Sequence, residues 1–263
     1  MELASIASGS SGNCILVKSD NANIIVDIGI SRKRVVEGLE FFDTKPSDID
    51  AIFITHEHLD HIKGLGVYLR SFATPVYGSK GTIDCLKNEI DLGPVDYSLF
   101  NVIDERVEIN DIVVKPIATK HDAAEPVLYR FESDDSAVAV VTDLGCYDKG
   151  LVQQLQGLDG LLVEANHDVN MLQVGPYPYN LKTRIWSDQG HLSNETCAKL
   201  VDEISSSRLK HVILGHLSGE NNYPDLACQT VRNELDMSDS DITSDDIEIK
   251  VANRKSPSVK IVV

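Results

Sequence analysis

The sequence lacks the cysteine pairing of a secreted, disulfide-stabilised protein. Its 5 cysteines are odd in number and include no CxxC pair. With 263 residues, of which 42% are hydrophobic, the chain can bury a substantial core without covalent cross-links. We therefore expect free thiols, most of them buried as small apolar side chains, and a location in the reducing cytoplasm.

Long apolar runs are absent as well. No apolar segment approaches the ~20 residues that a membrane-spanning helix requires. Met1, Glu2 and Leu3 are followed by neither the basic region nor the apolar stretch of a signal peptide. These absences predict a protein without membrane association.

Basic residues are few, at 24 against 41 acidic residues, so the net charge is −17. This charge works against sequence-independent adhesion to nucleic acid. It does not exclude a nucleic-acid substrate, because bound divalent cations would create a local positive centre that the formal charge omits. If phosphates bind, the candidate basic contacts are Arg32, Lys33, Arg34, Lys182 and Arg184.

Short apolar runs alternate with helical patterns along the chain. Strand patterns cover residues 3–7, 15–18, 24–27, 51–55, 76–77, 107–109, 112–117, 127–132, 137–142, 161–164, 212–215, 247–252 and 259–263. Helical patterns cover residues 31–39, 62–71, 81–88, 149–155, 194–204 and 225–235. We predict an α/β fold over residues 1–263 as one domain, with two mixed β-sheets face to face and helices outside them.

The run from His56 to His61 carries four potential metal ligands in six residues and follows a predicted buried strand. Loops at strand ends are where such architectures place their chemistry. Alternate residues of an extended turn point the same way, so His56 and His58 can hold one ion, and Asp60 and His61 can reach a second. Two divalent ions ~3.5–4 Å apart can share a hydroxide and lower its pKa.

One turn cannot complete two coordination spheres, so further ligands must come from elsewhere. His121, Asp143 and His216 each stand just past a predicted strand. That shared placement would gather them at the same rim as the histidine run. We therefore predict them as the remaining metal ligands.

The run from Thr55 to His61, with Asp27 after the apolar residues 24–26, resembles the metallo-β-lactamase fold, an αββα sandwich. His121, Asp143 and His216 match the remaining motif positions of that superfamily in order. The segments 8–14, 163–168, 190–194 and 215–218 resemble its YycJ (WalJ) branch. Proteins of that branch are regarded as metal-dependent nucleases with 5′-to-3′ exonuclease activity on DNA.

The resemblance implies a role for each ligand. His56, His58 and His121 would hold the first metal ion. The second would be held by Asp60, His61 and His216, with Asp143 bridging the two ions and Asp27 orienting the histidine loop. Five histidines favour zinc, whereas the two carboxylates also permit manganese or iron.

Six polar residues near these motifs are candidates for substrate contact. A turn rich in glycine and serine presents Ser10, Ser11 and Asn13, which either form an ordinary hairpin turn or cradle a phosphate. Asn166, His167 and His191 either fix loops or contact substrate. We favour His191 as the proton donor to the leaving group, because it precedes a capped helix and imidazole titrates near neutrality.

The predicted function is a di-metal phosphodiesterase, a 5′-to-3′ DNA exonuclease, with Asp60 and His191 as catalytic residues. An alternative is the hydrolysis of a small ester, thioester or cyclic phosphodiester on the same scaffold. A metal or redox sensor is less favoured, because His58 stands where flavodiiron relatives have an acid. An inactive, partner-dependent subunit would have lost ligands, and none is missing. The sequence leaves the oligomeric state open.

Overall fold

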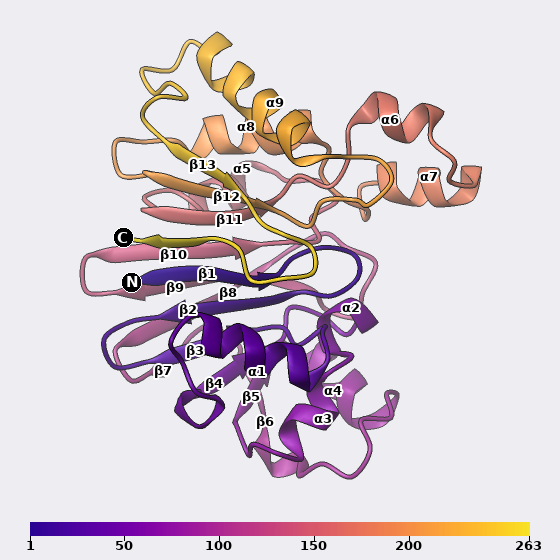
Figure 1. Cartoon of the computed structure of the whole chain (residues 1–263), viewed down its shortest axis with the longest axis vertical. Helices are drawn as coiled ribbons and strands as arrows, with labels where there is room; N and C mark the ends of the chain where they lie inside the picture. Colours follow the sequence, from indigo (N-terminus) through magenta and orange to yellow (C-terminus); the bar gives the residue numbers. More distant parts are fainter.

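Two mixed β-sheets lie face to face in the computed structural model, which describes all 263 residues (Figure 1). The first sheet has the order β14-β1-β2-β3-β4-β5-β6. Its strands are β1 (Glu2–Ala7), β2 (Cys14–Lys18), β3 (Asn23–Val26), β4 (Ala51–Phe53), β5 (Val76–Gly78), β6 (Phe100–Val102) and β14 (Lys260–Val262). The terminal strands β1 and β14 pair antiparallel, so the two ends of the chain lie side by side.

The second sheet has the order β13-β12-β11-β10-β9-β8-β7. Its strands are β7 (Val107–Ile109), β8 (Ile112–Ala118), β9 (Val127–Ser133), β10 (Ser136–Val141), β11 (Gly160–Glu164), β12 (His211–Gly215) and β13 (Glu248–Val251). Strands β10 to β13 run parallel, and β9 is antiparallel to both β8 and β10. The C-terminal ends of β8, β10, β11 and β12 therefore meet at one edge.

Helices cover the outer faces of both sheets (Figure 1). Over the first sheet lie α1 (Arg32–Phe41), α2 (Leu59–Ile62), α3 (Leu65–Leu69) and α4 (Lys80–Asn88), with 3-10 turns at Pro46–Asp48 and Tyr97–Leu99. Over the second lie α5 (Lys149–Gln154), α8 (Asn194–Ile204) and α9 (Pro224–Met237). The remaining helices, α6 (Val169–Val174) and α7 (Tyr179–Trp186), project beyond this layer.

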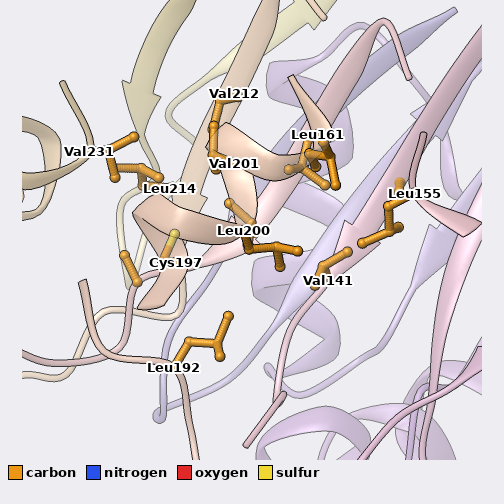
Figure 2. Close-up of a cluster of buried hydrophobic side chains, with 14 of the residues drawn as sticks. Val141, Leu155, Leu161, Leu192, Cys197, Leu200, Val201, Val212, Leu214 and Val231 are labelled. Atoms are coloured by element: carbon orange, nitrogen blue, oxygen red, sulfur yellow. The ribbon is translucent and has the colours of Figure 1, made fainter. Parts of the chain in front are cut away.

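Three buried clusters hold the four layers together, and alternation along the strands assigns side chains to them. In β12, Val212 and Leu214 face the helices, whereas Ile213 faces the other sheet. Figure 2 shows the helix-side cluster, where Leu200 of α8 packs among side chains of the second sheet. Each fully buried aliphatic side chain of this size stabilises the fold by about 1.5–3 kcal/mol.

The predicted architecture is confirmed, but two local predictions were wrong and three elements were missed. The helix predicted over 62–71 is two short helices, because the Gly64 N–H donates to the Ile28 carbonyl at 2.8 Å rather than to the carbonyl four residues earlier. The run from His56 to His61 is extended only as far as His58, and Asp60 and His61 lie on α2. Strand β6 and helices α6 and α7 were not predicted. None of the helices combines the length and apolarity needed to cross a membrane.

Candidate metal centre

The predicted metal ligands gather at the edge where the parallel strands end. His56 follows β4, Asp143 follows β10 and His216 follows β12. Asp27, Asp143 and His216 adopt positive φ angles of 61°, 58° and 52°. Left-handed backbone is uncommon outside glycine and is held by surrounding structure where it occurs, which is typical of functional sites.

Three histidines form the first group. The Nε2 atom of His56 lies 3.0 Å from Nδ1 of His58, which in turn lies 3.3 Å from Nε2 of His121. Two nitrogen ligands of a tetrahedral zinc ion, each at 2.0–2.1 Å, lie about 3.3 Å apart. The spacing of these three nitrogens therefore fits a single ion.

The opposite ring nitrogens of two of these histidines are occupied. Nε2 of His58 lies 3.1 Å from the Asp122 carbonyl oxygen, and Nδ1 of His121 lies 3.0 Å from that of Gly190. A carbonyl oxygen can only accept, so each of these nitrogens carries the proton. The other nitrogen of each ring then presents its lone pair to the first group, as metal ligation requires.

Asp27 organises the histidine loop from beneath. Its Oδ2 atom accepts from Nδ1 of His61 at 2.7 Å and from the Thr55 hydroxyl at 2.9 Å, while Oδ1 accepts from the Thr55 backbone N–H. The Thr55 hydroxyl oxygen, whose proton goes to Asp27, lies 3.0 Å from Nδ1 of His56. When these two rings are neutral, this arrangement leaves the lone pair at Nε2 of each.

Asp143 lies between the two halves of the site. Its Oδ2 atom is 3.0 Å from Nε2 of His61 and 3.0 Å from Nδ1 of His216. Its Oδ1 atom is 3.8 Å from Nε2 of His121. Asp60 approaches from α2, with Oδ2 3.6 Å from His61 and 3.8 Å from His216.

The buried polar atoms at this edge fit a cation. Asp143 Oδ2 and both ring nitrogens of His216 are buried without a well-directed hydrogen bond. Such atoms are costly to bury unless a ligand satisfies them. Since seven imidazole and carboxylate groups converge here, the donor set suits a borderline divalent metal.

The close packing of these groups shifts their pKa values in the metal-free site. Burial lowers the pKa of His56 well below its usual value. Burial also disfavours charge on His61 and His216, but neighbouring carboxylates outweigh it. They raise the pKa of His61 well above its usual value and that of His216 to about 9. Burial raises the pKa of Asp143, but His216 and His61 outweigh burial and hold that pKa well below its usual range.

Metal binding at pH 7 is expected to release protons, because His61 and His216 are protonated in the metal-free protein and a ligand must be deprotonated. Apparent affinity should rise with pH between 6 and 8 by about tenfold per unit for each displaced proton. Calorimetry of zinc binding in buffers of different ionisation enthalpy measures the number of protons released per bound ion. A buffer-independent heat at pH 7 would contradict the expectation.

Glu164, at the end of β11, was missed as a site residue. It is fully buried, and its Oε1 atom accepts from the backbone N–H groups of Leu144 and Leu192. Its Oε2 atom lies 3.1 Å from Nδ1 of His191, a nitrogen that also lies 3.5 Å from Asp143. The available signal was an acid ending an apolar strand, the same signal that marked Asp143.

Five of the seven predicted ligands line a cavity of about 270 Å³, called here the metal-site cavity: His58, Asp60, His121, Asp143 and His216. Its lining includes three of the predicted substrate residues, Ser10, Asn166 and His191. From the unpredicted segment α6–α7 come Tyr177, Leu181, Arg184 and Ile185.

The remaining substrate candidates do not line the metal-site cavity. Ser11 lies in an adjacent groove. Asn13 is buried behind the site, where Oδ1 accepts from the Gly9 N–H and Nδ2 lies 3.1 Å from His61. His167 is also buried, and burial lowers its pKa to about 4. Because both side chains are buried outside the lining of this cavity, substrate contact by Asn13 and His167 stays a prediction that the geometry does not support.

Helix α7 is fixed over the cavity by an ion pair. Nε and Nη2 of Arg184 donate to the two carboxylate oxygens of Asp122 at 2.6 and 2.9 Å. Asp122 also lies 3.3 Å from Nε2 of His121 through Oδ1. The bidentate geometry adds direction to this contact, so the roof of the cavity is joined to the metal-ligand loop.

Two face-to-face sheets with outer helices and a rim of histidines and carboxylates define the class of metal-dependent hydrolases with the metallo-β-lactamase fold. The family model described as the β-lactamase superfamily domain matches residues 22–216, and the chain belongs to that family. The structure is similar to the metallo-β-lactamase fold protein YhfI from Bacillus subtilis, with a TM-score of 0.71, 15% identity and 99% coverage of each chain.

Two curated relatives cover most of the chain. The sequence is 40% identical over 236 residues to exodeoxyribonuclease WalJ of Streptococcus pneumoniae serotype 2 (strain D39), covering 89% of this chain and 88% of that one. It is 36% identical over 231 residues to exodeoxyribonuclease YycJ of Bacillus anthracis, covering 88% of each. The chain is thus a homologue of exodeoxyribonucleases with a buried His/Asp metal-site cluster, as the sequence motifs predicted.

Substituting Asp27 by asparagine is expected to weaken metal binding or activity about 10–100-fold, the usual effect of losing an outer carboxylate partner. Asparagine tolerates the positive φ but provides only one accepting oxygen for Thr55 and His61. Competition with a chromophoric zinc chelator measures the affinity. Asp43→Asn, an exposed position with φ 53°, is the matched control. Equal zinc affinities in the two variants would show that Asp27 does not support metal binding.

Proposed function

We propose that the protein is a two-metal phosphodiesterase that removes nucleotides from a DNA end, with 5′-to-3′ polarity. The observation that carries the proposal is the Asp143 carboxylate, whose two oxygens face separate histidine groups. The homology to exodeoxyribonucleases over most of the chain supports DNA as the substrate.

The proposed ligand sets are those that the family resemblance implies, and the distances are compatible with them. His56, His58 and His121 would hold one ion, and Asp60, His61 and His216 would hold the other, with Asp143 shared. Zinc suits the five histidines best, and manganese or iron is compatible with the two carboxylates. When bound, two such ions supply an activated water and offset the charge of the phosphate oxygens.

The chain's own residues supply orientation and a proton. Glu164 holds Nδ1 of His191, so Nε2 is the nitrogen left to face substrate in the metal-site cavity. We assign His191 to protonation of the departing sugar oxygen. Ser10 and Asn166 also line the cavity and provide hydrogen-bonding groups for phosphate oxygens.

An end-label assay tests the proposal. Metal-reconstituted protein is incubated with 5′- and 3′-labelled DNA and RNA, single- and double-stranded, beside Asp60→Ala. We expect progressive loss of the 5′ label from DNA, no cleavage by Asp60→Ala, and no cleavage in chelator. Cleavage of no polymer, with hydrolysis of small esters or thioesters, would overturn the proposal in favour of a small-molecule hydrolase.

A further inference from the structure

A second, larger depression of about 700 Å³ adjoins the metal-site cavity and shares Ser10 and Tyr177 with it. We call it the Arg254 groove. Four separate segments build it: the β1–β2 turn, the α6–α7 link, the β12–α9 loop and the β13–β14 loop. Its lining residues that bear on the argument are Ser10, Ser11, Tyr177, Arg254, Lys255 and Ser256.

The Arg254 groove is locally positive in a strongly acidic chain. Arg254 and Lys255 are consecutive, and Glu220 is the single carboxylate in the lining. The chain as a whole carries a net charge of −17. A basic strip beside the reacting site, flanked by serine hydroxyls, is the chemistry that binds a phosphate backbone.

Hydrogen bonds between its loops fix the position of the Arg254 groove. The Ser8 N–H donates to the Asn253 carbonyl, and the Ser8 hydroxyl accepts from the His216 N–H at 2.9 Å. These bonds tie the β1–β2 turn to both the β13–β14 loop and a predicted metal ligand. The position of the groove relative to the cavity is therefore fixed by backbone.

Arg254 is held in place by its neighbours. Its Nη1 atom donates to the Ser218 carbonyl at 2.7 Å, and its aliphatic stem lies over Gly9, where a Cβ would come within 2.9 Å of Cγ. A guanidinium has five N–H donors, and that one bond leaves others for an oxyanion. Lys255 beside it is exposed.

Tyr177 stands where the two depressions meet and is half-buried. An aromatic ring beside a cationic strip is the combination by which proteins hold single strands, with bases stacked on rings and phosphates on basic groups. A duplex offers no free base face for such a ring along its length. The occupant that fits is a single strand.

Resting on the proposed function, we propose that the Arg254 groove binds the single-stranded DNA that adjoins the phosphodiester in the metal-site cavity. Arg254 and Lys255 contact its phosphates, and Tyr177 stacks on a base. The groove thereby selects a polymer over a small diester, although the chain is acidic.

The test measures binding and cleavage together. Lys255→Ala and Lys255→Glu remove or reverse an exposed charge, so the fold is retained. Lys210→Ala, at the opposite end of β12 from His216, is the matched control. Fluorescence anisotropy of a labelled single strand on the Asp60→Ala background gives Kd against salt. Steady-state kinetics compare a long single strand, a dinucleotide and bis(p-nitrophenyl) phosphate.

We expect Lys255→Ala to raise Kd and KM for the long strand about threefold to tenfold and to lower the salt slope by about one. Lys255→Glu should have a larger effect, whereas Lys210→Ala should have none. Tyr177→Leu should weaken strand binding roughly tenfold without changing the salt slope. Cleavage of bis(p-nitrophenyl) phosphate should stay unchanged in both Lys255 variants.

Unchanged strand binding in both Lys255 variants, with DNA still digested, would overturn the groove while leaving the proposed function intact. Equal effects of the Lys255 substitutions on the dinucleotide and on the long strand would also overturn it. If the unsubstituted protein hydrolyses bis(p-nitrophenyl) phosphate but no DNA, the proposed function fails first.

Discussion

Asp143→Asn is expected to lower kcat for DNA digestion by at least about 10³-fold and to reduce bound metal. The carboxylate faces His61 and His216 with one oxygen and His121 with the other, and an amide cannot replace its charge on both sides. Several kcal/mol of transition-state charge stabilisation is attributed to metal ions in such sites. Since about 1.4 kcal/mol is tenfold in rate, that loss corresponds to three or more orders of magnitude.

The substitution is informative because the backbone should survive it. Asn is, with Asp, among the residues that adopt positive φ most readily, so the φ of 58° is preserved. Asp134→Asn, at φ 46° in the β9–β10 turn, is the matched control and should keep full activity. Tm, metal content by mass spectrometry and kcat are measured for both. Near-normal activity in Asp143→Asn with two metals bound would remove Asp143 from the bridging position.

The placement of metal-site residues at the ends of strands was predictable from the sequence. Apolar runs identified the strands, and the polar residue following each run marked the edge where parallel strands end. His56, Asp143 and His216 share that signal, and the structure brings all three together. Glu164 carries the same signal after residues 161–163, but only its neighbours Asn166 and His167 were predicted as site residues.

The segment over the cavity was not predictable. Helices α6 and α7 are short, and Gly175, Pro176 and Pro178 interrupt the sequence between them. Helices of this length are marginal by propensity alone and depend on tertiary contacts. The N-cap of α6 is local, because Asp168 accepts from the Met171 N–H at 2.7 Å, whereas the tertiary contact is the Arg184–Asp122 pair. That pair joins residues 62 positions apart and could not be inferred from local sequence.

The sequence also did not predict which side chains at the site face the cavity. Asn13 and His167 are polar residues of the kind that contact substrates, yet both are buried. Spacing predicts which loop a residue occupies, whereas the packing of adjacent loops decides whether its side chain faces the cavity. Ser10, three residues before Asn13, does face it.

His191→Gln is the second substitution with a large expected effect, a loss of about 10²–10⁴-fold in kcat on DNA, the usual contribution of general acid catalysis. Glutamine retains some hydrogen bonding but cannot deliver a proton near neutrality. The loss should vanish with thymidine 5′-p-nitrophenyl phosphate, because p-nitrophenolate leaves without protonation. Glu164→Gln should give a smaller loss of the same kind, since Oε1 can still accept from Leu144 and Leu192.

The comparison of leaving groups separates a proton donor from a metal ligand. His191 also lies within 4.8 Å of Asp143, Glu164 and His216, so a role in metal binding has a distinct signature. If His191 were a ligand, both substrates would be lost together and metal content would fall. His211→Gln is the control, because His211 makes the same kind of contact with Glu248, at 3.0 Å, at the opposite end of β12. Selective loss of DNA cleavage with metal retained is the result that assigns the proton to His191.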